Sequence, residues 1–362
     1  MTLGKIRAFL KKYERIIIPA ALIVGFIFDN LTLTRVDKWF DNIILSTYIL
    51  LAAISITIIH AKKNSFTEKR WFLKIQAFMP LVISYALGGL FSGLFIFYSR
   101  SGTIYTSFPF MLALLVLFIG NDYIQAKYKQ IIFQIIIFYV AIFSYSILIV
   151  PIIIGEMNAW AFMVGTILSI ILIMFYIEIL VFFTDSSFKY KLKIVYKSVI
   201  AIASVFVLFY FMNIIPPIPL SLKDGAIAHS VQKEPNLEYK VLIEEPKWYR
   251  PFKDYAKVFH YQKGEGIYAF SSVFAPTTIR GKILHKWSYF DPEKIRWVET
   301  DVIPITINGG RDGGSRGYSV KQTVWDGKWR VDITSEKGQV IGRLKFTVKT
   351  DGNESNLLTT YR

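Results

Sequence analysis

The feature that most constrains this chain is a series of long apolar stretches that stops near residue 220. A helix needs about 20 apolar residues to cross the ~30 Å hydrocarbon core of a bilayer. Seven stretches meet or approach that length, which predicts an all-α transmembrane bundle over residues 16–214. The expected spans are 16–34, 42–59, 75–98, 104–124, 131–150, 159–183 and 195–214.

The charges in the loops predict how the bundle is oriented. Residues 1–222 contain 19 Lys and Arg, and 16 of these fall in the N-terminal segment and in every second loop. Cytoplasmic loops carry an excess of cations. The N-terminus is therefore expected in the cytoplasm, and an odd number of spans places the C-terminal part outside it. Residues 1–15 combine cations with helically spaced apolar residues, as in a short basic amphipathic helix on the inner leaflet.

The net charge of +16 does not indicate a nucleic-acid partner, because ten of these charges lie in residues 1–222, where they fix membrane orientation. The partner expected there is the lipid bilayer. The 140 residues after position 222 hold 23 Lys and Arg and 17 Asp and Glu, so the composition changes sharply. That break predicts a second domain.

The second domain has the alternation of β-strands. A proline-rich segment, 215–225, ends the last span because consecutive prolines cannot continue a helix. Beyond it, apolar Trp329, Val331 and Ile333 alternate with polar residues, and similar patterns cover 266–274, 283–289, 294–307, 318–325 and 340–348. Many short strands separated by polar turns predict an extracytoplasmic, immunoglobulin-like β-sandwich over 226–362. The chain has no cysteine, so the core alone must stabilise this domain.

A glycine-rich loop at 308–318 is the candidate binding site of this domain. Successive glycine N–H groups and two arginines are suited to cradle an anion. The loop lacks the lysine and the strand–loop–helix context of a nucleotide-binding loop. A glycine-rich hairpin loop without a ligand is the favoured alternative. The candidate binding residues are Gly310, Arg311, Gly314 and Arg316.

Glu178 is the one carboxylate well inside an expected span. A buried intramembrane acid is by default a functional hypothesis, for example in proton or cation handling. However, Glu178 lies six residues before Thr184, about 9 Å from the helix end. A structural role, with the carboxylate reaching the cytoplasmic interface, is favoured.

The first outer turn concentrates charge. Asp41 is expected to cap the second helix by accepting its free N–H groups. A cation-binding or docking site is conceivable there, but a charge-paired, capped turn is favoured. The polar candidates of this turn are Asp29, Arg35, Asp37 and Asp41.

Two further patterns bear on assembly and chemistry. Gly89 and Gly93 form a G-x-x-x-G, which lets helices approach closely within the bundle or between two copies of the chain; a homo-oligomer is left open. The histidines show no metal-ligand spacing, and His285 is expected on a core face. No catalytic set emerges, so we expect no enzyme activity, no cofactor and no metal.

Several motifs resemble an uncharacterised bacterial family of membrane proteins with a C-terminal domain of unknown function. They are the loop NGGRDGGSRGY, the strand GKWRV and the hairpin GQVIGR, preceded by ILHKWSYF, together with IIPPIPLSLKDGAIAH and the turn GFIFDNLTLTRVDKWFDN. The resemblance covers roughly residues 25–45 and 213–348. It implies a bacterial cytoplasmic-membrane protein with an exported β-domain, and it supplies no catalytic residue.

These observations favour a non-enzymatic binding, scaffolding or sensory protein. Its exported domain would recognise a protein or a polymer of the cell envelope. The alternative is a transporter or ion-coupled protein that works through the bundle and Glu178.

Overall fold

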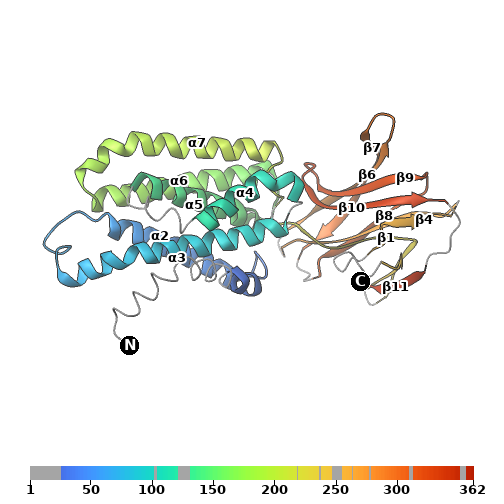
Figure 1. Ribbon diagram of the computed structural model, residues 1–362, viewed down its shortest axis with the longest axis horizontal. Helices are drawn as coiled ribbons and strands as arrows, with labels where there is room; N and C mark the ends of the chain where they lie inside the picture. The colour runs from blue at the N-terminus through green and yellow to red at the C-terminus, as the bar shows by residue number, and fades with distance from the viewer. Residues whose placement is uncertain are drawn as a thin grey trace, which may run out of the picture. The chain divides into compact units, whose positions relative to one another are not determined.

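The computed structural model of the protein describes two compact units (Figure 1). The helical unit ends at Ile215, and the β unit consists of Pro216–Arg362 with two short earlier segments, Arg100–Ser107 and Gly155–Met157. The basic segment 1–15, most of the first expected span and two loop residues, Gly310 and Arg311, lie outside the described residues. The described ranges are 26–101, 104–120, 131–217, 219–235, 238–246, 255–262, 264–276, 279–309, 313–350 and 356–362.

The helical unit contains five helices that are long and apolar enough to cross a membrane, within the described ranges. They correspond to five of the seven expected spans. The fourth expected span contains the shorter helix α4, of 17 residues. The elements are α2 (Trp39–Ile59), α3 (Arg70–Arg100), α4 (Ile104–Gly120), α5 (Ile131–Ile154), α6 (Ala159–Phe183), the 3-10 helix η2 (Ser186–Lys191) and α7 (Leu192–Phe211).

Helix α5 lies at the centre of this unit and contacts α2, α6 and α7. The G-x-x-x-G of α3 packs against side chains of the same unit. A Cβ at Gly89 would lie 2.7 Å from the ring of Tyr48, and one at Gly93 would lie 2.8 Å from Leu45 Cδ2. Small residues are therefore required there for packing within the bundle, against α2.

The described residues of the β unit form three sheets. One has the order β1-β5-β8, a second has the order β4-β10-β9-β6-β7, and the third has the order β11-β3-β2. All pairs are antiparallel except β10 with β4. The strands are β1 (Ser221–Ala228), β2 (Ser230–Lys233), β3 (Tyr239–Glu244), β4 (Val258–His260), β5 (Ile267–Phe274), β6 (Arg280–Asp291), β7 (Arg296–Asn308), β8 (Ser315–Lys321), β9 (Gly327–Ser335), β10 (Val340–Lys349) and β11 (Leu357–Tyr361).

One hydrophobic core joins the three sheets. Phe270 of β5, Val241 of β3, and Trp287 and Trp329 of the five-stranded sheet are all fully buried in it. Burying large aromatic side chains stabilises a domain by several kcal/mol in total, at about 25 cal/mol per Å². The core therefore holds a unit that has no disulfide.

Alternation predicted strands β5 to β10 but not β1 to β4 or β11, whose short segments lack a clear period. Strand β1 begins at Ser221, within the segment 215–225 that was expected to be a linker. In β10, the alternation places the apolar Ile341 on the outward face with the polar residues. The register shifts between Val340 and Gly342, and this bulge lets the Ile341 side chain be buried.

Candidate functional site

Cationic side chains gather on one face of the five-stranded sheet, the face turned away from the core. Val331 and Ile333 of β9 point into the core, so Arg330 and Asp332 point the other way. Strand pairing places residues of β6 and β10 directly beside them. Among the described residues, the cationic face, as we name it, consists of Lys286, Lys328, Arg330, Arg343 and Lys345, together with Asp332, Glu299, Phe290 and Trp297. Lys286 Nζ lies 3.6 Å from Glu299 Oε2, so this cation is already paired.

A nearly buried carboxylate organises this face. Asp332 lies opposite Arg343 in the sheet and accepts two hydrogen bonds from it, Nε to Oδ1 at 2.5 Å and Nη2 to Oδ2 at 2.9 Å. A bidentate pair of this kind fixes the plane of the guanidinium. Arg330 Nε lies 3.4 Å from the same Oδ2 atom. Two guanidinium groups thus converge on one carboxylate, which leaves an excess positive charge.

Arg330 keeps most of its donor capacity unused. Its Nε atom is buried and makes no hydrogen bond with any described residue. The guanidinium stacks on the ring of Trp297, 4.6 Å from its centroid. Burial lowers the pKa of Arg330; Asp332 opposes this effect and the nearby Arg343 adds to it. An arginine nevertheless stays protonated in proteins, so the charge is permanent.

Aromatic side chains border the cations at the edge of the sheet. Phe290 of β6 is paired with Trp297 of β7, and their rings meet edge to face at 5.3 Å. Lys328 Nζ lies 5.7 Å from the centroid of Phe290. Strand β7 is the last strand of this sheet. Guanidinium and ammonium groups donate hydrogen bonds and retain their protons, so this face is suited to bind anions and not to act as a base.

Sequence reasoning did not single out this face, although a signal was present. Cations recur two residues apart at the outward positions of both strands of one hairpin, Lys328 with Arg330 and Arg343 with Lys345. Period-two cations on paired strands must share a face. The pattern did not reveal that Asp332 would be shared by two of them.

The glycine-rich loop connects two different sheets. It joins β7 of the five-stranded sheet to β8 of the three-stranded sheet, so the expected hairpin is wrong. Gly314 is buried with φ +88, and a Cβ there would lie 2.9 Å from the backbone of Val273. This glycine packs against β5, which explains why the position has no side chain. Arg316 is half-buried on β8, opposite Ser272.

The first outer turn is charge-paired, but its acids act differently from expectation. Asp41 does not cap α2, which begins at Trp39 without a side-chain cap. Instead Asp41 is buried and its Oδ2 accepts from the backbone N–H groups of Thr34 and Arg35, at 2.9 and 3.0 Å. Arg35 forms a bidentate pair with Asp37, with Nη2 to Oδ2 at 2.6 Å. Asp29 is partly exposed nearby in the chain. The turn is stabilised by its own charges.

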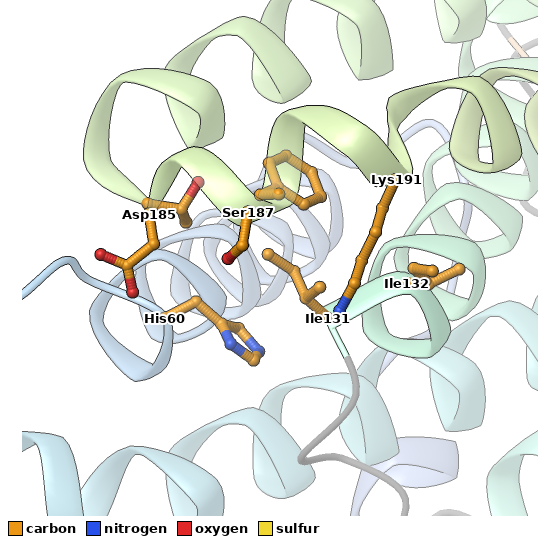
Figure 2. Close-up of a pocket in the computed structure, with 8 residues that line it drawn as sticks. His60, Ile131, Ile132, Asp185, Ser187 and Lys191 are labelled. Atoms are coloured by element: carbon orange, nitrogen blue, oxygen red, sulfur yellow. The ribbon is translucent and has the colours of Figure 1, made fainter.

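Glu178 is exposed on α6, where Tyr196 of α7 donates a long hydrogen bond of 3.5 Å to its Oε1. A separate cavity of about 460 Å³ lies in the helical unit (Figure 2), and Glu178 does not line it. The polar residues among the described ones that line it are His60, Thr184, Asp185, Ser187 and Lys191. The wall carries one cation and one carboxylate, so its charge selects no class of ligand.

Buried polar groups in the β unit are structural. His285 is fully buried, as expected, between Ser271 at 2.8 Å and Ser319 at 2.9 Å. These contacts link β6 to β5 and β8 across the core. Burial lowers the pKa of His285 to about 4, so the ring is neutral near pH 7.

A second polar cluster links two of the sheets. Glu244, at the end of β3, accepts from the backbone N–H of His260 at 2.5 Å and from the His260 ring at 3.0 Å, and it lies 3.3 Å from His229 Nε2. Burial raises the pKa of Glu244, but these hydrogen bonds outweigh it and hold the pKa below its ordinary value. Within the described ranges, no group of three or more His, Cys, Asp or Glu could hold a metal ion.

The comparisons with known proteins add one assignment. Residues 280–348 match a family described as a protein of unknown function (DUF2914). This match covers β6 to β10 and so includes the cationic face. No curated protein matches the chain. Among solved structures, the Pseudomonas fluorescens alkylpurine DNA glycosylase AlkC bound to DNA is similar at 9% identity over 86% of this chain and 99% of that one. Its TM-score of 0.21 carries no argument about fold or function.

Proposed function

We propose that this chain is an integral membrane protein of the bacterial cytoplasmic membrane whose exported β unit recognises a protein or polymer of the cell envelope. The five long apolar helices support insertion in a bilayer. The bias of cations toward alternate loops supports a cytoplasmic N-terminus and an extracytoplasmic β unit. The three sheets around one core support an immunoglobulin-like sandwich, although β4 pairs in parallel with β10.

The observation that carries the recognition role is the cationic face. Within the described residues it holds five cations and two acids, Asp332 and Glu299, and the Nε of Arg330 makes no hydrogen bond. Such a surface is suited to binding an anionic partner through hydrogen bonds and charge. Its groups do not form a catalytic set, so we propose binding or sensing and not an enzyme, with no cofactor and no nucleic-acid partner.

The position of Glu178 does not support the alternative that the bundle transports a substrate or an ion. Glu178 faces outward on α6 and is not part of the cavity wall in Figure 2. We therefore favour the helices as an anchor that also relays a signal. The packing of Gly89 and Gly93 inside the bundle leaves the oligomeric state to experiment.

Two measurements in living cells test this proposal. A reporter enzyme that is active only outside the cytoplasm should be active when it is fused after Arg362. Activity of a reporter that works only in the cytoplasm, fused at the same position, would refute the topology. A photoreactive residue in place of the exposed Lys345 should crosslink to an envelope component. The same residue in place of Lys240, exposed on β3, is the matched control. Equal labelling at both positions, or none at either, would refute recognition through the cationic face.

A further inference from the structure

We infer that the cationic face binds an acidic polysaccharide, with Arg330 and Arg343 holding an acidic group of the polymer and Trp297 bordering a sugar ring. This inference rests on the proposed function and names the ligand class of the same surface. It starts from the imbalance around Asp332, where two guanidinium groups share one carboxylate. A second acidic group, from a ligand, would restore the balance of charge.

The donors of Arg330 point to that acidic group. A guanidinium has five N–H donors in a planar fork that matches carboxylate and phosphate oxygens. Arg330 is only 21% exposed at its side chain, and within the described part of the chain its Nε has no hydrogen-bond partner. The Nε atom itself is buried, 3.4 Å from Asp332 Oδ2, so an anion would meet the part of the side chain that remains exposed. A charge-assisted hydrogen bond at a partly buried guanidinium is stronger than one at a fully exposed arginine.

The spacing of the cations favours a polymer over a single small anion. Pairing across β10, β9 and β6 aligns Lys345 with Arg330, and Arg343 with Asp332 and Lys286, in two neighbouring rows. A third row contains Lys328. Successive residues on one face of a strand are about 7 Å apart, and adjacent strands about 4.8 Å apart. The cations therefore cover a strip that one small anion cannot span.

The aromatic border favours a sugar over a flexible polyanion. Trp297 and Phe290 lie on the same face as the cations and at the open edge formed by β7. Aromatic rings beside charged donors offer apolar contact area, which a sugar ring can cover and a peptide carboxylate chain covers less well. A nucleic acid also carries both negative charges and rings, its phosphates and bases, so the experiment includes an oligonucleotide as a probe.

The test uses the purified full chain in discs of neutral lipid, with binding measured against four probes at low salt. Polygalacturonate should bind, whereas neutral dextran, polyglutamate and a single-stranded oligonucleotide should bind at least about tenfold more weakly. Binding of polygalacturonate should weaken as salt is raised, because ions screen exposed charges.

Variants assign the binding to the face. Arg330→Gln should weaken polygalacturonate binding by about tenfold or more, the effect of losing a hydrogen bond to a charged group. Lys240→Gln removes one exposed charge from another sheet and should leave binding unchanged. The double variant Lys328→Gln with Lys345→Gln alters only exposed side chains and should weaken binding even if Arg330→Gln disturbs folding.

Several results would overturn the inference. They are equal binding of polyglutamate or of the oligonucleotide, loss of binding in Lys240→Gln, and no binding of polygalacturonate by the folded protein. If polygalacturonate fails to bind while the residue at position 345 still crosslinks selectively in cells, the ligand class is wrong and the recognition role stands. If both fail, the proposed function fails as well.

Discussion

The buried histidine of the β unit should make its stability depend on pH in a defined window. His285 is fully buried, and within the part of the chain that the structure describes its two ring nitrogens are hydrogen-bonded to the hydroxyl groups of Ser271 and Ser319. Trp287 Nε1 also donates to the Ser319 hydroxyl, at 3.0 Å. No carboxylate touches the ring through any of these contacts, so adding a proton places an uncompensated charge in the core.

The size of the effect follows from the shift in pKa. Burial lowers the pKa of His285 from 6.5 to about 4 in the folded protein. Between these two values the unfolded chain binds more protons, so stability rises with pH in that window and falls as the pH is lowered. The full shift corresponds to about 3 kcal/mol of unfolding free energy, of which about 2 kcal/mol should be lost between pH 7 and pH 5.

The assay is a denaturant titration of the full chain in mild detergent, followed by tryptophan fluorescence at both pH values. Two of the reporters, Trp287 and Trp329, are buried in the core of the β unit. His285→Gln cannot titrate in this range, so the loss between pH 7 and pH 5 should be smaller in the variant by about 2 kcal/mol. Equal losses in the two proteins would refute the assignment of a neutral, buried ring.

Three further predictions concern the β unit. Gly309→Ala should lower the unfolding free energy of the β unit by about 2 kcal/mol or more, because the new methyl group would lie 1.7 Å from the carbonyl oxygen of Pro276. Gly281→Ala is the control: its methyl group meets open space, so this variant should change the unfolding free energy little in the same thermal melt. Ile295 has a φ of +50 and is 80% exposed, so Ile295→Asn should raise the melting temperature by relieving about 1 kcal/mol of backbone strain; a lower melting temperature would contradict this. Glu244→Gln should cost about 1–3 kcal/mol at pH 7. This difference from wild type should shrink as the pH falls from the ordinary glutamate pKa of 4.5 toward the lower pKa of the folded protein, because the unfolded chain then binds a proton at Glu244 that the native protein does not; a pH-independent difference in denaturant titrations would argue against it.

Much of the architecture could be predicted from local patterns. Five of the expected spans coincide with long apolar helices, and the alternating stretches coincide with strands β5 to β10. His285 was correctly expected on a core face. These predictions succeed because span length and strand alternation depend on residues close together in the sequence.

The candidate site was predicted less well. Asp41 was expected as a helix cap, but it bonds backward to the amides of Thr34 and Arg35, since α2 begins two residues before it. The cradle for anions in the glycine-rich loop stays a prediction, since Gly310 and Arg311 lie outside the described residues. The error at Asp41 arises because a side chain that suits a local motif can instead bind a neighbouring segment that the motif does not include.

The sequence by itself determined that the first part of the chain is apolar enough to span a bilayer, which of its loops carry the cations, and which side chains of β9 and β10 face outward. Only the tertiary structure decided that Arg330 and Arg343 share Asp332 while Arg330 stacks on Trp297. The physical reason is that alternation fixes the face on which a strand presents a residue. Register and strand order, which depend on contacts distant in the sequence, fix which charges meet on that face.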